Sequence, residues 1–164
     1  MGKKLFYFFL GLIFILTLFS GLEKAKAAEA GDIIINEIMY DADGTDDDHE
    51  WVELLNLSDF AIGITGGSAG WKFNDGSNHT LDIPTGQLFS VESGEYFILA
   101  DDKETFLLDY PSFQGQIIDT TMELTNTIDT ISLINNTSQI IDTVIYQSSW
   151  GANGNGRTLE KNNS

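Results

Sequence analysis

The residues best suited to chemistry lie in one acidic segment, Asp41–Glu50, which reads DADGTDDDHE. Its carboxylates are Asp41, Asp43, Asp46, Asp47, Asp48 and Glu50. Calcium takes roughly six to eight oxygen ligands from carboxylates and carbonyls, and Gly44 permits a sharp turn among these acids. The spacing differs from the EF-hand loop, in which glycine follows three alternating oxygen ligands. We therefore interpret the segment first as a solvated acidic loop and second as a calcium site that orders on binding.

Two other acids, Glu37 and Glu53, lie inside apolar runs typical of β-strands, where acids are disfavoured. A carboxylate pair could serve a glycosidase. The structural alternative, which we favour, is that both accept hydrogen bonds from loops or face solvent. His49 and His79 are the only histidines, and one histidine among carboxylates is a poor zinc site. Because the chain also lacks a nucleophile elbow and a phosphate-binding glycine loop, we expect no catalytic residue and no cofactor other than calcium.

The three tryptophans are candidates for a binding surface or for the core. Trp71 follows Gly70 and precedes Phe73, which predicts a core position. Trp150 lies in the polar, glycine-rich sequence QSSWGANGNG and is therefore predicted to be in a loop. Binding residues are common on loops, so Trp150 is the best candidate for a contact surface.

The charge of the chain excludes several classes of partner. The formal net charge is −17, from 25 Asp and Glu against 8 Lys and Arg. Phosphate affinity comes from lysine and arginine, so we expect no binding to nucleic acid or to anionic membranes. The chain has no cysteine, which excludes thiol catalysis and cysteine-ligated zinc.

The first residues have the pattern of a secretory signal peptide. Lys3 and Lys4 precede an apolar run, and the small residues of AKAAEA follow. We predict a signal peptide over residues 1–27 and a single folded domain over residues 28–164, with cleavage after Ala27, or as a second choice after Ala30. The alternative is an uncleaved membrane anchor, because the apolar stretch is close to the roughly 18–20 residues of a membrane span. Either outcome predicts a secreted or cell-surface protein.

The remainder of the chain has the pattern of an all-β protein. Short apolar runs alternate with turn residues, which is typical of an antiparallel sandwich or barrel. We expect strands over 33–39, 51–56, 61–64, 71–73, 80–83, 96–100, 117–119, 130–134, 140–146 and 158–160. Asp129–Tyr146 predicts a hairpin, with Asn135 and Asn136 supplying the left-handed backbone of its turn. Ala100–Pro111 predicts one short helix, capped by Asp101 or Asp102 and covering the open end of the sandwich.

These pieces together resemble the lamin tail domain in its bacterial, exported form. The matching sequences stand in the family's order and are IIINEIMY, the acidic loop running into EWVELLN, GWKFNDG, GEYFILADD, the Asp129–Tyr146 hairpin and GNGRTLE. Two departures are the GGSA insertion before Gly70 and Leu55, where an aromatic residue is common. The resemblance implies an immunoglobulin-like antiparallel β-sandwich. It also favours a structural role for Glu37 and Glu53, because both positions belong to the family's common pattern.

The resemblance implies an interaction or anchoring module rather than a catalyst. We therefore expect a non-enzymatic exported module that binds a surface protein or a polysaccharide. It would touch a membrane only if the N-terminal segment stays uncleaved. The first alternative is a calcium-dependent adhesin or carbohydrate-binding domain. The second is an accessory domain of a secreted hydrolase or nuclease, which the DNA downstream of Ser164 would reveal.

Overall fold

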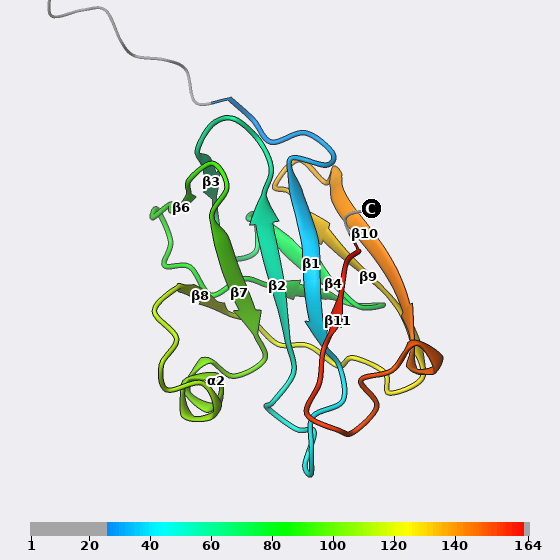
Figure 1. Ribbon diagram of the computed structural model, residues 1–164. Helices are drawn as coiled ribbons and strands as arrows, with labels where there is room; N and C mark the ends of the chain where they lie inside the picture. The colour runs from blue at the N-terminus through cyan, green and yellow to red at the C-terminus, as the bar shows by residue number, and fades with distance from the viewer. Residues whose placement is uncertain (1–25, 163–164) are drawn as a thin grey trace, which may run out of the picture.

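Two packed β-sheets form the body of the molecule (Figure 1). The computed structural model describes residues 26–162. Its strands are β1 (Ile33–Met39), β2 (Trp51–Asn56), β3 (Ile62–Ile64), β4 (Lys72–Asn74), β5 (Asn78–Thr80), β6 (Phe89–Val91), β7 (Tyr96–Ala100), β8 (Gln116–Asp119), β9 (Ile128–Ile134), β10 (Ile140–Gln147) and β11 (Leu159–Glu160). The helix α2 (Lys103–Asp109) and the 3-10 turn η1 (Ser148–Trp150) complete the set. The predicted immunoglobulin-like β-sandwich with one short helix is confirmed.

The sheets are antiparallel with one exception. The strand order is β11-β1-β2-β7-β8 in the five-stranded sheet and β10-β9-β4-β5 in the four-stranded sheet, while β3 and β6 form a separate pair. β7 and β8 run parallel because α2 carries the chain back between them. The sequence analysis predicted only antiparallel pairs, since three-residue runs such as Ile117–Asp119 do not show their direction.

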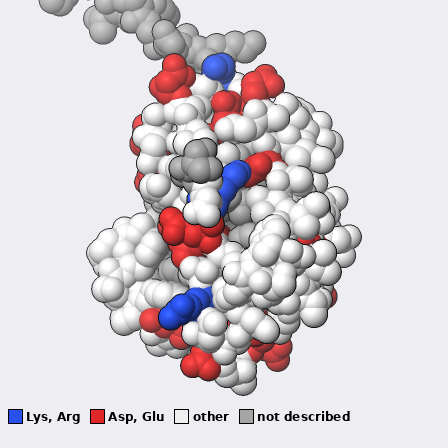
Figure 2. All heavy atoms as spheres, turned by 45° about the vertical axis from the view of Figure 1, so that its right-hand side comes forward, with Lys and Arg blue, Asp and Glu red and all other residues white. Residues whose placement is uncertain are grey.

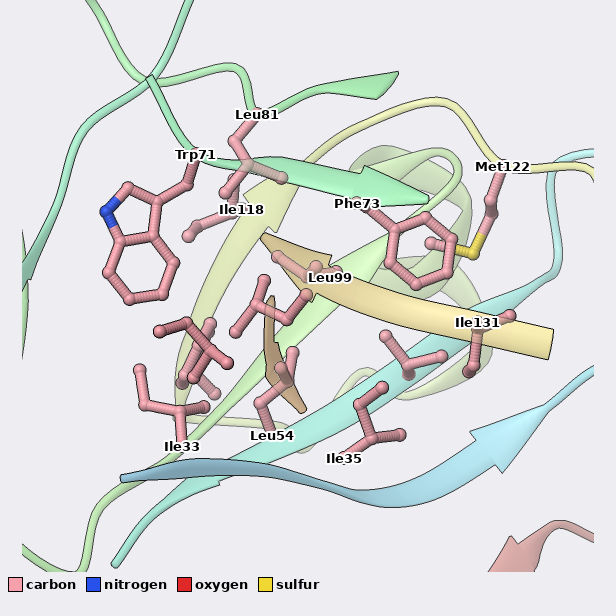
Figure 3. Close-up of a cluster of buried hydrophobic side chains, with 14 of the residues drawn as sticks. Ile33, Ile35, Leu54, Trp71, Phe73, Leu81, Leu99, Ile118, Met122 and Ile131 are labelled. Atoms are coloured by element: carbon pink, nitrogen blue, oxygen red, sulfur yellow. The ribbon is translucent and has the colours of Figure 1, made fainter. Parts of the chain in front are cut away.

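The core lies between the two sheets and follows the alternation of the strands (Figure 3). Val52 and Leu54 of β2 point inward, as do Phe97 and Leu99 of β7. In β1 a bulge at Asn36 changes the alternation, so that Ile33 and Ile35 face the core before it and Ile38 and Tyr40 face the core after it. Trp71 packs in this core as predicted.

The helix is where the sequence predicted it, but it covers a different surface. Asp102 caps it, because its carboxylate accepts a hydrogen bond of 2.7 Å from the Thr105 N–H. Phe106 packs on the outer face of the five-stranded sheet against side chains that include Met39, Trp51, Ile98 and Ala100. The prediction that the helix covers the open end of the sandwich is therefore wrong. The apolar outer residues of β1, β2 and β7 provide the surface that attracts it.

The β9–β10 hairpin forms as predicted, with Ile131, Leu133 and Ile141 buried. Its left-handed residue is Ser138, with φ of 65°, rather than Asn135 or Asn136. The side chain of Asn135 instead stabilises the turn, because its carbonyl oxygen accepts hydrogen bonds from the backbone N–H groups of Thr137 and Gln139, both at 2.9 Å. The prediction named the correct turn and the wrong left-handed residue.

The two remaining errors concern short strands. β5 lies at Asn78–Thr80, whereas the sequence predicted a strand over 80–83, and β6 was not predicted. The predicted signal peptide lies outside the described residues, apart from Lys26 and Ala27. Within residues 26–162 no helix is long and apolar enough to cross a membrane.

Candidate functional site

The acidic segment connects β1 to β2 at the lower end of the molecule (Figure 1) and divides into two groups. Asp41 accepts a hydrogen bond from the backbone N–H of Gly154, and Asp43 lies beside Gly156. Burial, and then the charge of Asp46, raises the pKa of Asp41. This first group therefore fixes the loop that follows η1.

The second group lines a pocket of about 220 Å³. Its acids are Asp46, Asp47 and Glu50 from the acidic segment and Asp101 from the residue after β7, and Glu123 lies opposite. From the sequence, Asp101 was expected only as a helix cap, so its place in the pocket was missed. Asp48 takes a left-handed conformation with φ of 67° and donates its backbone N–H to Asp101.

Two acids of this pocket and two outside it hold a stretch of chain that has no regular structure. The four successive backbone N–H groups of residues 122–125 each donate to a carboxylate, and three of these carboxylates come from distant parts of the chain. The acceptors, in the order of the donors, are Asp101 at 2.9 Å, Asp75 at 2.8 Å, Glu50 at 2.9 Å and Asp129 at 3.2 Å. Backbone groups without a ladder need such partners. We name residues 122–125 the carboxylate-held segment.

Glu50 is the most strongly perturbed of these acids. Glu50 is buried, with only 6% of its surface exposed. Its pKa is raised to about 8. Desolvation is the largest cause, the hydrogen bond from the Leu124 N–H opposes it, and the charges of Asp46, Asp101 and Asp75 add to it. Its carboxyl group is therefore costly to ionise in the folded protein.

The six acids of the predicted calcium site do not form one cluster. Among residues 26–162, no three His, Cys, Asp or Glu side chains lie close enough together to hold a metal ion. Asp46 is engaged on both oxygens, by the Ala42 N–H at 2.9 Å and the Asn126 amide at 2.8 Å. Calcium binding stays a prediction, and it requires the loop to rearrange around the ion.

Glu37 and Glu53 stand directly opposite each other on β1 and β2, and Glu160 of β11 stands opposite Glu37. Glu53 accepts a hydrogen bond of 2.9 Å from the Asn36 amide, and Glu37 accepts one from the Thr158 hydroxyl. Desolvation first, and then the charges of Glu37 and Glu160, raise the pKa of Glu53. These contacts bind the bulge and the segment before β11, which is the structural role that we favoured from the sequence.

The two histidines also connect loops. His49 lies 2.7 Å from a carboxylate oxygen of Asp109 at the end of α2. His79 lies 2.8 Å from Asp75 and 2.7 Å from the Thr121 hydroxyl. Because His79 contacts the same Asp75 that accepts from the carboxylate-held segment, it belongs to the same polar network.

Asn56, at the end of β2, is a structural residue that the sequence analysis missed. It is fully buried, and its amide nitrogen donates to the carbonyls of Phe60 at 3.0 Å, Val91 at 3.0 Å and Glu92 at 3.1 Å. Its side-chain oxygen accepts from the Ser58 N–H at 3.0 Å and the Ser58 hydroxyl at 2.7 Å. An asparagine directly after the two apolar residues Leu54 and Leu55 at the end of the strand was the available signal.

Trp150 is exposed, as predicted, with 61% of its surface accessible. It ends η1, which is held by a hydrogen bond from the Ser148 N–H to the Thr127 carbonyl at 2.7 Å. The Tyr40 hydroxyl donates to the Gly151 carbonyl at 2.5 Å, and the Tyr40 ring packs on Tyr146. The indole is therefore presented on a fixed turn.

Trp150 borders a groove of about 390 Å³ between β10 and the β1–β11 edge. Its apolar lining is Ile35, Ile38, Val144, Tyr146, Trp150 and Leu159, and its polar lining includes Glu160 and Lys161. Figure 2 turns this side of the molecule forward and shows acidic side chains gathered at the middle of the face, with few basic ones. An exposed aromatic beside an apolar groove is typical of a binding site.

A comparison with protein families gives one match. The model of the family described as Lamin Tail Domain matches residues 26–148, which include every strand from β1 to β10. None of the curated proteins searched is similar enough to match.

Proposed function

Because the chain belongs to the lamin tail domain family, we propose that it is a non-catalytic, exported module that binds a protein or a polymer at the cell surface. The observation that carries this proposal is Trp150, an exposed aromatic side chain on a fixed turn beside an apolar groove. Tryptophan is enriched among the residues that dominate binding energy. The hydrogen bonds of Glu37, Glu50, Glu53 and Asp101 support a structural role for the acids rather than a catalytic one.

Trp150→Ala is expected to weaken binding of the chain to the envelope of its own organism by tenfold or more. A tryptophan that the partner buries on binding contributes roughly 2 kcal/mol or more to the binding free energy. Co-sedimentation of residues 28–164 with an envelope preparation measures this. The melting temperature should change little, because the indole is exposed. Leu108→Ala is the matched control, because Leu108 is an exposed apolar residue on α2, 80% accessible and outside the groove. Equal binding by the Trp150 variant would contradict the proposal, as would no binding by the wild-type chain.

A calcium-dependent adhesin is the second candidate, favoured by the convergence of Asp46, Asp47, Glu50 and Asp101 on one pocket. Burial is the main cause of the raised pKa of Glu50, and a divalent cation there would offset the repulsion from Asp46, Asp101 and Asp75 that adds to it.

If this candidate is correct, millimolar calcium raises the melting temperature relative to chelator, because an ion that binds only the folded state stabilises it. The double variant Asp46→Ala with Asp48→Ala should lose that increase, and any calcium-dependent binding to glycans with it. Magnesium at the same concentration controls for ionic strength. A melting temperature that is the same in calcium and in chelator would eliminate the candidate.

A further inference from the structure

We infer that the groove beside Trp150 takes an extended, basic peptide segment, which adds as a strand to the free edge of β10. This inference rests on the proposed binding function and names its site and the chemistry of its partner. Its four supports are an open strand edge, an uncharged edge sequence, an anchor pocket and the charge of the surrounding surface.

The edge of β10 is open over most of its length. β10 is the last strand of the four-stranded sheet, and its ladder partner is β9. Within the described part of the chain, one backbone hydrogen bond reaches its other edge, from the Gly31 N–H to the Ile141 carbonyl at 2.7 Å. The edge over the second half of β10 therefore offers backbone donors and acceptors that an added strand could pair with.

The sequence of this edge does not protect it. Edge strands are usually blocked by charges, by proline or by a covering loop. Asp142 protects the first half of β10 in this way, because its carboxylate accepts from the Ile35 N–H at 2.8 Å and lies 3.4 Å from the Lys161 ammonium. The second half, Thr143–Gln147, reads TVIYQ and holds neither a charge nor a proline. These are residues that favour a β-strand.

The groove offers sites for the side chains of such a strand. Val144 and Tyr146 line it from β10, Leu159 lines it from β11, and Trp150 lines it from η1. Because alternate side chains of a strand point to the same side, apolar side chains of an added peptide would enter the groove at every second position. The intervening side chains would point away from it.

The charge of the surface favours a basic peptide in this groove over a second copy of this chain. Glu160 and Lys161 both line the groove, and the Lys161 ammonium lies 3.4 Å from the Asp142 carboxylate. Glu37 and Glu53 continue from Glu160 in a row across β1 and β2, so the acids beside the groove outnumber this one base. A second copy of this chain carries its own formal net charge of −17 and is repelled by this face. A segment with lysine or arginine at the outward positions is attracted.

The test uses residues 28–164 and a capped seven-residue peptide of alternating lysine and valine, followed by the backbone amide resonances of the domain. We expect the largest shifts over 142–150 and an affinity that falls about tenfold between roughly 50 and 300 mM salt. The same peptide with glutamate in place of lysine should bind at least tenfold more weakly. Methylation of alternate peptide nitrogens should abolish binding, because those nitrogens donate to β10 in the inferred register.

Glu160→Gln should weaken the lysine peptide about threefold, whereas Glu104→Gln, an exposed acid on α2, should leave the affinity unchanged. Equal binding of the methylated peptide, or shifts centred on the acidic segment, would overturn the inference. Binding of a neutral oligosaccharide without the peptide, or a concentration-dependent dimer blocked by Trp150→Ala, would also overturn it. If envelope binding needs Trp150 while no peptide binds, the proposed function stands and this inference fails.

Discussion

Replacing Asn56 with aspartate is expected to destabilise the domain by about 3 kcal/mol or more at neutral pH. The new carboxylate would have the shape of the amide but no N–H groups. It would stand against the carbonyl oxygens of Phe60, Val91 and Glu92, which now accept from the amide at 3.0 to 3.1 Å. One carboxylate oxygen would keep the hydrogen bonds from the Ser58 N–H and hydroxyl, but the other would face three acceptors with no donor of its own, in a buried site that penalises the charge. Urea unfolding of the variant and of the wild type at pH 7 measures the difference.

The pH dependence of this stability loss shows whether the buried charge of the new carboxylate causes it. Burial raises the pKa of such a carboxyl group, so the folded variant binds a proton more tightly than the unfolded chain does. The deficit should therefore shrink as the pH falls, because the protonated group can donate one hydrogen bond. Asn136→Asp is the matched control, since Asn136 is exposed in the β9–β10 turn. A loss below about 1 kcal/mol, or a loss that is independent of pH, would contradict this role of Asn56.

Glu50→Gln is expected to stabilise the domain by about 1 kcal/mol or more at pH 8 to 9, which corresponds to roughly 4 °C in melting temperature. The glutamine keeps an oxygen that can accept from the Leu124 N–H, now bonded at 2.9 Å, and it removes a charge from a desolvated site. Because the folded pKa of Glu50 is raised to about 8 from 4.5, its contribution to stability is fully present below pH 4.5. That contribution is lost as the pH rises through about 8. Thermal melts of both proteins from pH 4 to pH 9 measure this.

The variants should therefore agree near pH 4 and separate as the pH rises. Glu50→Ala removes the same charge but leaves the Leu124 N–H without its acceptor, so it should be less stable than Glu50→Gln by about 1 to 3 kcal/mol at every pH. Glu104→Gln on α2 changes the same charge at an exposed position and should give no such separation. Parallel stability curves for the wild type and Glu50→Gln would contradict a costly ionisation at this site.

The fold could be predicted where local pattern and burial agree. β1, β2 and β7 begin and end at the predicted residues, because their apolar runs are bounded by polar turns. Trp71 in the core and Trp150 at the surface were also predicted from their neighbours. β6 was missed because it has three residues with a serine at its centre, and it follows the exposed Leu88.

The acidic pocket could be predicted only in part. Asp46, Asp47 and Glu50 were identified because they are adjacent in the sequence. Asp101 was missed because its place in the pocket depends on the pairing of β2 with β7, a contact between segments far apart in the chain. The carboxylate-held segment was missed for the same reason, because three of its four acceptors, Asp101, Asp75 and Glu50, come from segments far away in the chain. The spacing of residues close together in the sequence does not indicate such hydrogen bonds between distant segments.

The central claim is that the acids of this domain build its loops, while its partner binds beside Trp150. Amide hydrogen exchange of the domain, free and bound to the envelope preparation, tests this claim most directly. The account predicts slower exchange over 142–150 and 159–161 in the bound domain, with little change over 41–50 and 122–125. Protection confined to the acidic segment would contradict the account, because it would place the partner at the acids instead.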